Sequence, residues 1–525
     1  MIATPRQWGR AQARSNPAAP PMPAGRPTET NRSERDEIYF SPFLWSPISL
    51  VTGPCFSTVV DGKRQEKHLE SLGLTRPVLR GTDGSARHLT WPLGRRGNQA
   101  RRRMVNVALL PNDDGYGPSA LGSYVARALL ESYPEVSLIV QNQAAERFNR
   151  SLYDDKMRSG KVEVRPAFGG IRLTKTEQGG VNPLRSLADV RAYEEHARHY
   201  VLPDHVDFVV DIGTPAGVAA ARRRGIPAFT VFDHSWAKTY EMLLSEFCQS
   251  LARTLCLRDS VVRALVGLAS GFEVERAIRR MKEDEAKTTA VFLFPEFITP
   301  SCYYEHWKKG IKVRTVKIKG VFGGRGKEER REARQSMGLD PTSRRKAVYL
   351  LSGGTEIWDA KIPQIIRKLR RKRLAYDIVI FDRRAKAGKH RRIKDSCIVL
   401  VGPPKNGTVQ ALLPGIDLII TRAGGGIVND AIACRVPLVC VEEPGHVQVE
   451  MIRENCQNHG LTRRIWHKDF DKHPVEEIEK AFRDRAGNQE IKTKMAEIEN
   501  HKEFDVADRI VELYREHRGG SGAIS

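Results

Sequence analysis

Residues 421–441 decide the fold, and they read Thr421-Arg-Ala-Gly-Gly-Gly-Ile-Val-Asn-Asp-Ala-Ile-Ala-Cys-Arg-Val-Pro-Leu-Val-Cys-Val441. The order predicts a strand that ends at Thr421, a turn of three glycines without side chains, a helix, and a proline that leads into another strand. Glycines let a phosphate approach backbone N–H groups, and a helix N-terminus adds about half a positive charge. The stretch therefore predicts a diphosphate-binding turn in a parallel α/β sheet.

Two series of short apolar runs extend this pattern along the chain, and amphipathic segments separate the runs. Such alternation is typical of parallel strands joined by helices. The first series predicts strands at 105–110, 136–140, 206–210, 229–232 and 291–294, with a helix over 119–132. The second predicts strands at 347–351, 377–381, 397–401, 418–421 and 438–441, and helices at 362–373, 408–413, 427–434 and 491–516. The expected fold class is α/β, with two Rossmann-like, doubly wound domains.

The composition changes at Met104. Residues 1–103 are rich in Pro, Arg, Gly and Ser and show no sustained period, so we expect a disordered or mis-called N-terminal extension. The recognisable fold pattern begins within one residue of Met104, which leads to the hypothesis that this methionine is the natural start. The expected domains are then 104–316 and 317–525. Ligands bind at the carboxyl ends of such sheets, so the site is expected in a cleft between the domains.

Composition and charge exclude some classes of protein and leave others open. No stretch approaches the roughly 18 apolar residues of a membrane-spanning helix. The eight cysteines form no CxxC pair, which favours reduced, mostly buried thiols in a cytosol. The net charge of +23 fits either nucleic-acid phosphates or an anionic membrane surface. The expected location is the cytoplasm, with a peripheral position at the inner face of a membrane as the alternative.

The glycine turn also has a purely structural explanation, because an acidic residue near a helix start stabilises the helix by about 0.3–1 kcal/mol. The full order of strand, glycines, acid and proline is more specific. Asp430 is expected in the first helical turn, four residues past Gly426. A carboxylate there would reach the hydroxyls of a ribose, as acidic residues do in other nucleotide-binding folds.

These residues carry a family resemblance. The chain resembles the nucleotide-sugar-binding half of the family 28 glycosyltransferases at residues 422–430, at the return Arg435-Val-Pro437 and at Gln448. This family includes the peptidoglycan N-acetylglucosaminyltransferase and the diacylglycerol glycosyltransferases. The resemblance implies the GT-B fold, a UDP-sugar donor, inversion at the anomeric carbon, and neither a catalytic metal nor another cofactor. It also implies an acceptor domain at 104–316 and a nucleotide-sugar donor domain at 317–525.

The resemblance assigns the donor contacts residue by residue. It places the glycine turn at the diphosphate, Asp430 at the ribose and Gln448 at the donor sugar. The family usually has Glu at the ribose, and the Asn expected soon after Gln448 is absent, so the donor sugar stays open. Arg422 would assist the leaving diphosphate, or else face away from it. The glycines of the turn are Gly424, Gly425 and Gly426. The resemblance also places Gly353, Gly354 and Thr355 near the phosphates, and Val401 and Gly402 at the base.

The catalytic base is less clear from the sequence. Family members often carry a histidine in the loop before the first helix, but the corresponding residue here is Pro118, which takes no proton. An inverting transfer needs a base beside the acceptor hydroxyl. The candidates are Asp113, Asp114 and His234, with Glu296 as a fourth choice. Each has a structural alternative, a turn cap for the aspartates and a satisfied loop residue for the histidine.

Two other functions fit the same sequence. The first is a nucleotide-sugar 2-epimerase or hydrolase, which needs the same donor cradle. The second is a non-catalytic protein that binds nucleic acid or an anionic surface, for example through the basic run 361–394. For a glycosyltransferase, the leading hypothesis, the expected partners are a nucleotide sugar and a lipid-linked or glycan acceptor, and not nucleic acid. Asp469 and Asp471 have the DxD spacing of metal-dependent transferases, but they follow the last strand and are expected at the surface, so no metal site is expected.

Overall fold

The computed structural model describes residues 104–521 apart from 113, 115–116, 143–145, 167–170, 175–180, 233, 271, 318–329, 352–355, 371, 373, 383–384, 387, 403–408 and 499–504. All the described residues belong to one compact unit. The expected N-terminal extension lies outside the described residues.

The first sheet has seven strands in the order β3-β2-β1-β4-β5-β6-β7, and its strand pairs are parallel. This is the Rossmann order, which reverses between β1 and β4. In register, Leu109 of β1 lies opposite Val140 of β2 and Val210 of β4. The strands are β1 (Val105–Pro111), β2 (Val136–Gln141), β3 (Val162–Arg165), β4 (Phe208–Ile212), β5 (Ala228–Phe232), β6 (Ala290–Leu293) and β7 (Arg314–Lys317).

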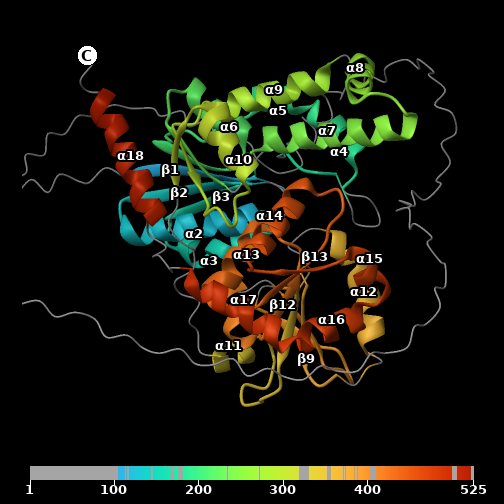
Figure 1. The fold of residues 1–525 in the computed structure, drawn as a ribbon. Helices are drawn as coiled ribbons and strands as arrows, with labels where there is room; N and C mark the ends of the chain where they lie inside the picture. Colours follow the sequence, from blue (N-terminus) through green and yellow to red (C-terminus); the bar gives the residue numbers. More distant parts are fainter. Residues whose placement is uncertain are drawn as a thin grey trace, which may run out of the picture. The chain divides into compact units, whose positions relative to one another are not determined.

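Helices connect these strands and cover the sheet (Figure 1). The face predicted for the first helix is buried, because Leu121, Val125 and Leu129 pack in the core. The helices are α2 (Gly117–Ser132), α3 (Glu146–Arg158), α4 (Pro183–Val190), α5 (Tyr193–His199), α6 (Pro215–Arg223), α7 (Trp236–Leu255), α8 (Asp259–Ala269), α9 (Glu273–Glu285), α10 (Ser301–Glu305) and the π-helix η1 (His306–Ile311).

The second sheet repeats the Rossmann order, with one antiparallel strand added at an edge. Its order is β10-β11-β9-β8-β12-β13-β14, and it reverses between β8 and β12. The strands are β8 (Ala347–Leu351), β9 (Asp377–Phe381), β10 (His390–Arg392), β11 (Ile398–Val401), β12 (Leu418–Thr421), β13 (Leu438–Val441) and β14 (Arg463–Ile465). The helices are α11 (Arg330–Ser336), α12 (Glu356–Arg370), α13 (Gly425–Cys434), α14 (Val447–Asn458), α15 (His467–Lys472), α16 (Pro474–Arg483) and α17 (Arg485–Glu497), with 3₁₀ turns η2 (Val409–Ala411) and η3 (Leu413–Gly415).

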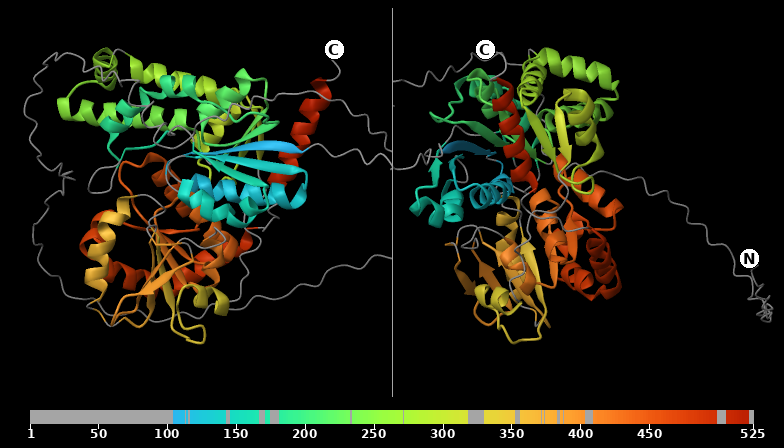
Figure 2. Two further views of the ribbon diagram at one scale, coloured as in Figure 1. Left: turned by 180° about the vertical axis from the view of Figure 1, so that it is seen from behind. Right: turned by 90° about the vertical axis from the view of Figure 1, so that its left-hand side faces the viewer.

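The last helix, α18 (Asp505–Ser521), packs against α2 of the first sheet. Tyr133 Oη donates a hydrogen bond to Asp508 Oδ1 at 2.8 Å, and the rings of Phe208 and Tyr514 are 4.7 Å apart. Figure 2 shows α18 beside the first sheet in two further views. The single helix predicted over 491–516 is therefore wrong. It is two helices, because α17 packs on α13 of the second sheet and α18 on the first.

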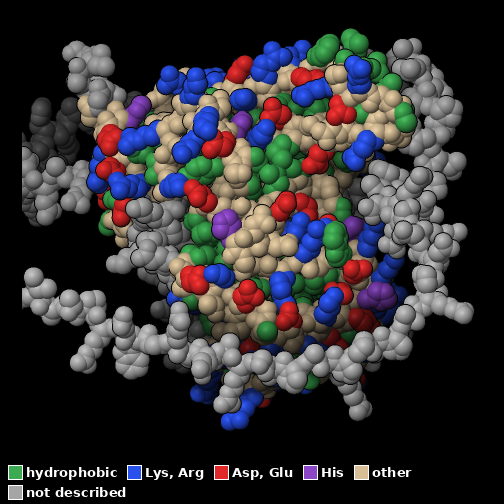
Figure 3. Space-filling model, in the orientation of Figure 1, with side chains coloured by type: hydrophobic (Ala, Val, Ile, Leu, Met, Phe, Trp, Pro, Cys, Tyr) green, Lys and Arg blue, Asp and Glu red, His purple; other side chains and the backbone are tan. Residues whose placement is uncertain are grey.

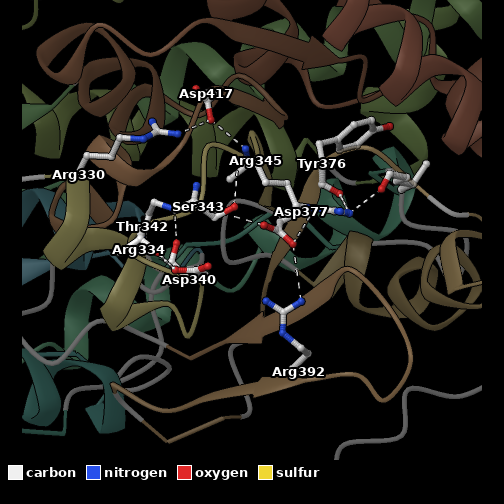
Figure 4. Close-up of polar contacts among 12 residues, drawn as sticks. Arg330, Arg334, Asp340, Thr342, Ser343, Arg345, Tyr376, Asp377, Arg392 and Asp417 are labelled. Atoms are coloured by element: carbon white, nitrogen blue, oxygen red, sulfur yellow. Dashed lines mark hydrogen bonds and ion pairs between the residues drawn. The ribbon is translucent and has the colours of Figure 1, made fainter.

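An ion-pair cluster lies at the amino ends of the strands of the second sheet (Figure 4). Asp377, the first residue of β9, is faced by three guanidinium groups at N···O distances of 3.2 to 3.7 Å, those of Arg345, Arg334 and Arg392. The Arg334 side chain is 1% exposed. Its Nε donates to Asp340 O at 3.0 Å, while Nη1 and Nη2 make no hydrogen bond with a described residue. Burial lowers the pKa of this guanidinium.

The expected fold class is confirmed, because both sheets are doubly wound and Rossmann-like. The helix predicted over 408–413 is wrong, since the described part of this segment forms short 3₁₀ turns around Pro414. No helix among the described residues is both long and apolar enough to span a bilayer. The seven described cysteines are free thiols. The domain boundary at 316–317 stays a prediction, because the segment that follows β7 lies outside the described residues.

Candidate functional site

The topology brings the predicted site residues to the points where the strand order reverses. In the first sheet, β1 leads into Asn112–Asp114 ahead of α2, and β4 leads into Gly213 and Thr214 ahead of α6. In the second sheet, β8 leads into 352–355 and β12 into Arg422–Gly424 ahead of α13. Ligands of open α/β sheets bind outside the carboxyl ends of the strands at such points. Both loops singled out in the sequence therefore lie where the fold favours a ligand.

The turn before α13 is built without side chains. Gly424 is the N-cap, with φ −75° and ψ 141°, and no side chain caps the helix. None of Gly424, Gly425 and Gly426 has a positive φ, and a Cβ at Gly424 or Gly426 would meet no described atom within 4 Å. The backbone conformation therefore requires none of the three glycines, and the packing of the described chain does not require Gly424 or Gly426. Free space above uncapped N–H groups at a helix start suits an anionic ligand.

Asp430 is engaged by the first sheet's helix. It is the sixth residue of α13 and so lies in the second turn, not in the first turn as expected. Its Oδ1 accepts hydrogen bonds from Tyr124 Oη at 2.7 Å and from Gln410 Nε2 at 2.8 Å, and the residue is 6% exposed. The contact between Tyr124 and Asp430 joins α2 and α13, the two helices that follow the reversal-point loops.

The surroundings of Asp430 favour its neutral form. Burial raises the pKa of Asp430 to about 7, against the opposing effects of the hydrogen bonds from Tyr124 and Gln410 and of the charge of Arg127. Asp211 at the end of β4 is similar, because burial raises its pKa to about 7 while hydrogen bonds from Thr214 and Thr230 oppose the shift. Two carboxyl groups in the interior therefore change charge near neutral pH.

The stability of the protein is expected to fall, through these two groups, as the pH rises from about 4 to about 7. In this range the folded state keeps protons that the unfolded state, with an aspartate pKa of about 3.9, has released. Rising pH therefore favours unfolding until both states are ionised above pH 7. Urea unfolding of the wild-type and of Asp430→Asn over this range measures the effect. The variant should lose part of the pH dependence, and parallel curves would contradict the assignment.

Arg422 is held beside the glycine turn by a buried ion pair. Its Nη1 lies 2.9 Å from Oε2 of Glu443, and the two side chains are 9% and 4% exposed. The Glu443 N–H donates to Glu450 Oε1 at 2.6 Å, which in turn ties the loop after β13 to α14. Arg422 Nε makes no hydrogen bond with a described residue. Sequence reasoning did not single out Glu443, although an acidic residue two positions past a buried parallel strand was visible.

The other predicted donor contacts have mixed outcomes. Gln448 is half-buried in the first turn of α14, which follows β13. The Val401 carbonyl accepts from Asp382 N, and Gly402 N donates to Lys389 O, both at 2.8 Å. These two backbone groups are used within the chain, so a contact with the base needs the second lone pair of the Val401 carbonyl oxygen or other atoms of the same residues. Gly353, Gly354 and Thr355 lie outside the described residues.

In the first sheet, the loop after β1 is tied to the loop after β4. The Asp114 N–H donates to Asn112 Oδ1 at 2.7 Å, and Asn112 Nδ2 donates to Gly213 O at 2.6 Å. The Asp114 residue is half-buried. Pro118, at the position of the family's histidine, is buried in the first turn of α2. Asp113 lies outside the described residues.

His234 is enclosed by aromatic rings. It is 2% exposed, and its ring centroid lies 4.3 Å from that of Phe232, 5.0 Å from that of Trp236 and 5.7 Å from that of Tyr303. Glu296 is exposed and its carboxylate pairs with Lys317 at 2.6 Å. A base must reach an acceptor hydroxyl, so the geometry favours Asp114 over His234.

The DxD pair has the expected position. Asp469 and Asp471 are exposed on α15, beyond the last parallel strands that carry the predicted donor contacts. No group of three or more His, Cys, Asp or Glu side chains in the described part of the chain is placed to hold a metal ion.

Solved structures match most of the chain. No family model matches the sequence, and no curated protein matches it. The matching structures include MurG of Acinetobacter baumannii (13% identity, 79% of this chain and 99% of that one, TM-score 0.39). They also include CalG4, the calicheamicin glycosyltransferase, with 16% identity over 79% of this chain and 98% of that one and a TM-score of 0.45. Arabidopsis thaliana UGT89C1 complexed with UDP matches with 14% identity over 79% of this chain and 99% of that one and a TM-score of 0.45. The fold is GT-B. Identities and TM-scores this low are no evidence of a shared substrate.

Proposed function

We propose that the protein is a glycosyltransferase that moves a hexose from a UDP-sugar to an acceptor hydroxyl, with inversion and without a metal. The glycine turn before α13 carries the proposal. None of its three glycines has a positive φ, a Cβ at Gly424 or Gly426 would meet no described atom within 4 Å, and no side chain caps the helix that begins at Gly425. Glycine inside a helix costs roughly 0.5–1 kcal/mol relative to alanine, so a ligand that needs the space is the simplest reason for the arrangement.

The proposed reaction uses both reversal points. The donor diphosphate lies on the N–H groups at the start of α13, and a carboxylate at Asp114 takes the proton of the acceptor hydroxyl. The acceptor oxygen then attacks the anomeric carbon while the bond from that carbon to the diphosphate breaks on the opposite face, which inverts the centre. Negative charge grows on the departing UDP, and fixed N–H dipoles with the nearby Arg422 stabilise it.

Asp430 would bind the ribose in this scheme. Its Oδ1 already accepts hydrogen bonds from Tyr124 and Gln410, whereas no hydrogen bond from a described residue to Oδ2 is present. The ribose diol would therefore bind at Oδ2 or replace Tyr124 at Oδ1. The acceptor, a lipid-linked or glycan hydroxyl, would be held by the first sheet beside Asp114.

The test is a substitution with opposite expected effects on stability and on binding. Gly426→Ala should raise the free energy of unfolding by up to about 1 kcal/mol, because alanine favours the helix and its Cβ meets no described atom. The same methyl group should weaken UDP binding roughly 10- to 150-fold, because charge-assisted hydrogen bonds worth about 1.5–3 kcal/mol are lost. Urea unfolding and calorimetric titration of UDP, with GDP and dTDP as competitors for selectivity, measure the two effects.

Gly519→Ala in α18 is the matched control. A Cβ there also meets no described atom within 4 Å, so this variant should gain stability and bind UDP like the wild-type. Wild-type binding of UDP by Gly426→Ala would remove the diphosphate from this turn. Incubation with UDP-sugars and candidate acceptors then separates the reactions. A transferred sugar indicates transfer, a free sugar indicates hydrolysis, and an epimerised nucleotide sugar indicates a 2-epimerase.

A further inference from the structure

A series of hydrogen bonds links the interior of the first sheet to the backbone of Asp114. It starts at Asp211 near the end of β4, which is 2% exposed and whose Oδ1 accepts from the Thr214 N–H. Thr214 Oγ1 in turn donates to Leu110 O of β1 at 3.0 Å. The turn that follows β4 is therefore anchored both to its own strand and to the neighbouring strand β1.

The conformation of this turn fixes the direction of one carbonyl group. Gly213 has φ +80°, which favours glycine, and a Cβ at this position would lie 2.4 Å from Cε1 of the Phe232 ring. The carbonyl oxygen of Gly213 accepts a hydrogen bond from Asn112 Nδ2 at 2.6 Å. Asn112 Oδ1 accepts the next hydrogen bond, from the Asp114 N–H at 2.7 Å. The Asn112 side chain thus connects the anchored turn to the loop that carries Asp114.

The place of Asn112 requires a side chain that donates on one side and accepts on the other. An amide has both functions, whereas a carboxylate of the same shape has no hydrogen to donate. Its backbone is held as well, because the Asn112 N–H donates to Ile212 O at 3.0 Å and the Asn112 carbonyl accepts from Asn142 Nδ2 at 3.1 Å. Asn112 is only 1% exposed, so a lost bond would leave a polar group with little access to water.

A general base needs a fixed position more than it needs exposure. Figure 3 shows acidic side chains scattered over the visible face of the protein, so an accessible carboxylate is not by itself prepared for catalysis. The carboxylate must lie within hydrogen-bond reach of the acceptor hydroxyl, and a displacement of about 1 Å can lower a rate by about 100-fold. The bonds through Asn112 give the Asp114 backbone a support of this kind.

We propose that Asn112 is a positioning residue that holds Asp114 in place as the base of the transfer. This inference rests on the proposed function and adds to it a residue that touches neither the donor nor the acceptor. Asn112 acts through Asp114 alone, so its contribution to the rate exists only while the carboxylate of Asp114 is present. That dependence distinguishes a positioning role from a general contribution to stability.

The experiment is a double-mutant cycle in the full chain, measured as the rate of UDP release with the UDP-sugar and acceptor that support transfer. Asn112→Ala should lower the rate roughly 10- to 100-fold in the wild-type. In the Asp114→Asn background it should lower the rate by less than about twofold, because a base that is absent cannot be misplaced. Asn112→Ser, whose hydroxyl can still accept from the Asp114 N–H, should lose less than Asn112→Ala. The dissociation constant of UDP should not change in these variants.

Asn142→Ala is the matched control. Asn142 is also 1% exposed, and its Nδ2 donates to the carbonyls of Pro111 and Asn112 at 2.9 and 3.1 Å, so it supports the same loop without a bond to Asp114. Any loss of rate in this variant should be the same with and without Asp114→Asn. Circular dichroism and urea unfolding check that the variants fold, and Asn112→Ser serves in the cycle if Asn112→Ala does not.

Hydrogen exchange tests the loop contact without any activity. The Asp114 amide, in peptides followed by mass spectrometry, should exchange roughly tenfold faster in Asn112→Ala, because its acceptor is lost, and at the wild-type rate in Asn142→Ala. Unchanged exchange in Asn112→Ala overturns the proposal. So does faster exchange with a wild-type rate of UDP release, or an equal loss of rate with and without Asp114→Asn.

Failure of the proposed function has a different signature. A wild-type protein that transfers no sugar, combined with faster exchange of the Asp114 amide in Asn112→Ala, would remove the reaction and the base that Asn112 positions. The hydrogen bond between the two residues would stand in that case as a structural contact only.

Discussion

Asp114→Asn is expected to lower the rate of UDP release from a UDP-sugar in the presence of acceptor by roughly 10²- to 10⁴-fold, the range for loss of a general base. The dissociation constant of UDP should not change, because the residue belongs to the first sheet and the donor contacts to the second. The substitution is nearly isosteric. The backbone hydrogen bond from residue 114 to Asn112 Oδ1 survives it, so the loop should keep its position.

The two other candidate bases supply the controls for this prediction. His234→Asn should lower stability, because it breaks the packing among Phe232, Trp236 and Tyr303, and should change the rate far less than Asp114→Asn does. Asp113→Asn should likewise have a small effect. A large rate loss in Asp113→Asn, together with a normal rate in Asp114→Asn, would move the role of the base to Asp113.

Asp377→Ala is expected to lower the free energy of unfolding by about 3–5 kcal/mol, the usual cost of leaving a buried charge without its partner. The carboxylate is 7% exposed and lies within 3.7 Å of three guanidinium nitrogens. The main cost comes from Arg334, whose buried charge loses its carboxylate partner. Its side chain is 1% exposed, and its terminal nitrogens make no hydrogen bonds with described residues. Urea or guanidinium unfolding measures the loss.

A double variant tests the reason for that loss. Asp377→Ala combined with Arg334→Met should recover much of the stability, since no buried charge is then left uncompensated. The cluster lies at the amino ends of the strands and the glycine turn follows a carboxyl end, so UDP affinity should be unchanged in both variants. A single variant within about 0.5 kcal/mol of the wild-type would show that the cluster is dispensable.

The sequence predicted the central strands well because their signal is strong. The buried runs 347–351, 377–381, 418–421 and 438–441 are strands with those bounds. Strands β10 and β14 were missed, since His390–Arg392 and Arg463–Ile465 are short and basic, and β7 at the other sheet's edge is Arg-Thr-Val-Lys. Charged residues on edge strands prevent pairing with other chains, and they also remove the apolar pattern by which a strand is recognised.

The candidate site could be predicted only where it depends on local order. The glycine turn and the loop of Asp114 follow from strand ends, which a sequence shows. The hydrogen bond from Tyr124 to Asp430 joins residues 306 positions apart, and the sequence around either residue does not indicate it. The enclosure of His234 by Tyr303 and the pairing of Arg422 with Glu443 depend in the same way on tertiary packing.

The return of α18 to the first sheet sets an order of events during translation. β7, the last strand of that sheet, ends at Lys317, whereas α18 begins at Asp505. At about 5–20 residues per second the ribosome needs roughly 10–40 s to make the intervening chain. Throughout that time the ring of Phe208 lacks Tyr514 and α2 lacks its outer neighbour. The newly made first half therefore exposes an apolar surface to which a chaperone can bind until α18 has been synthesised.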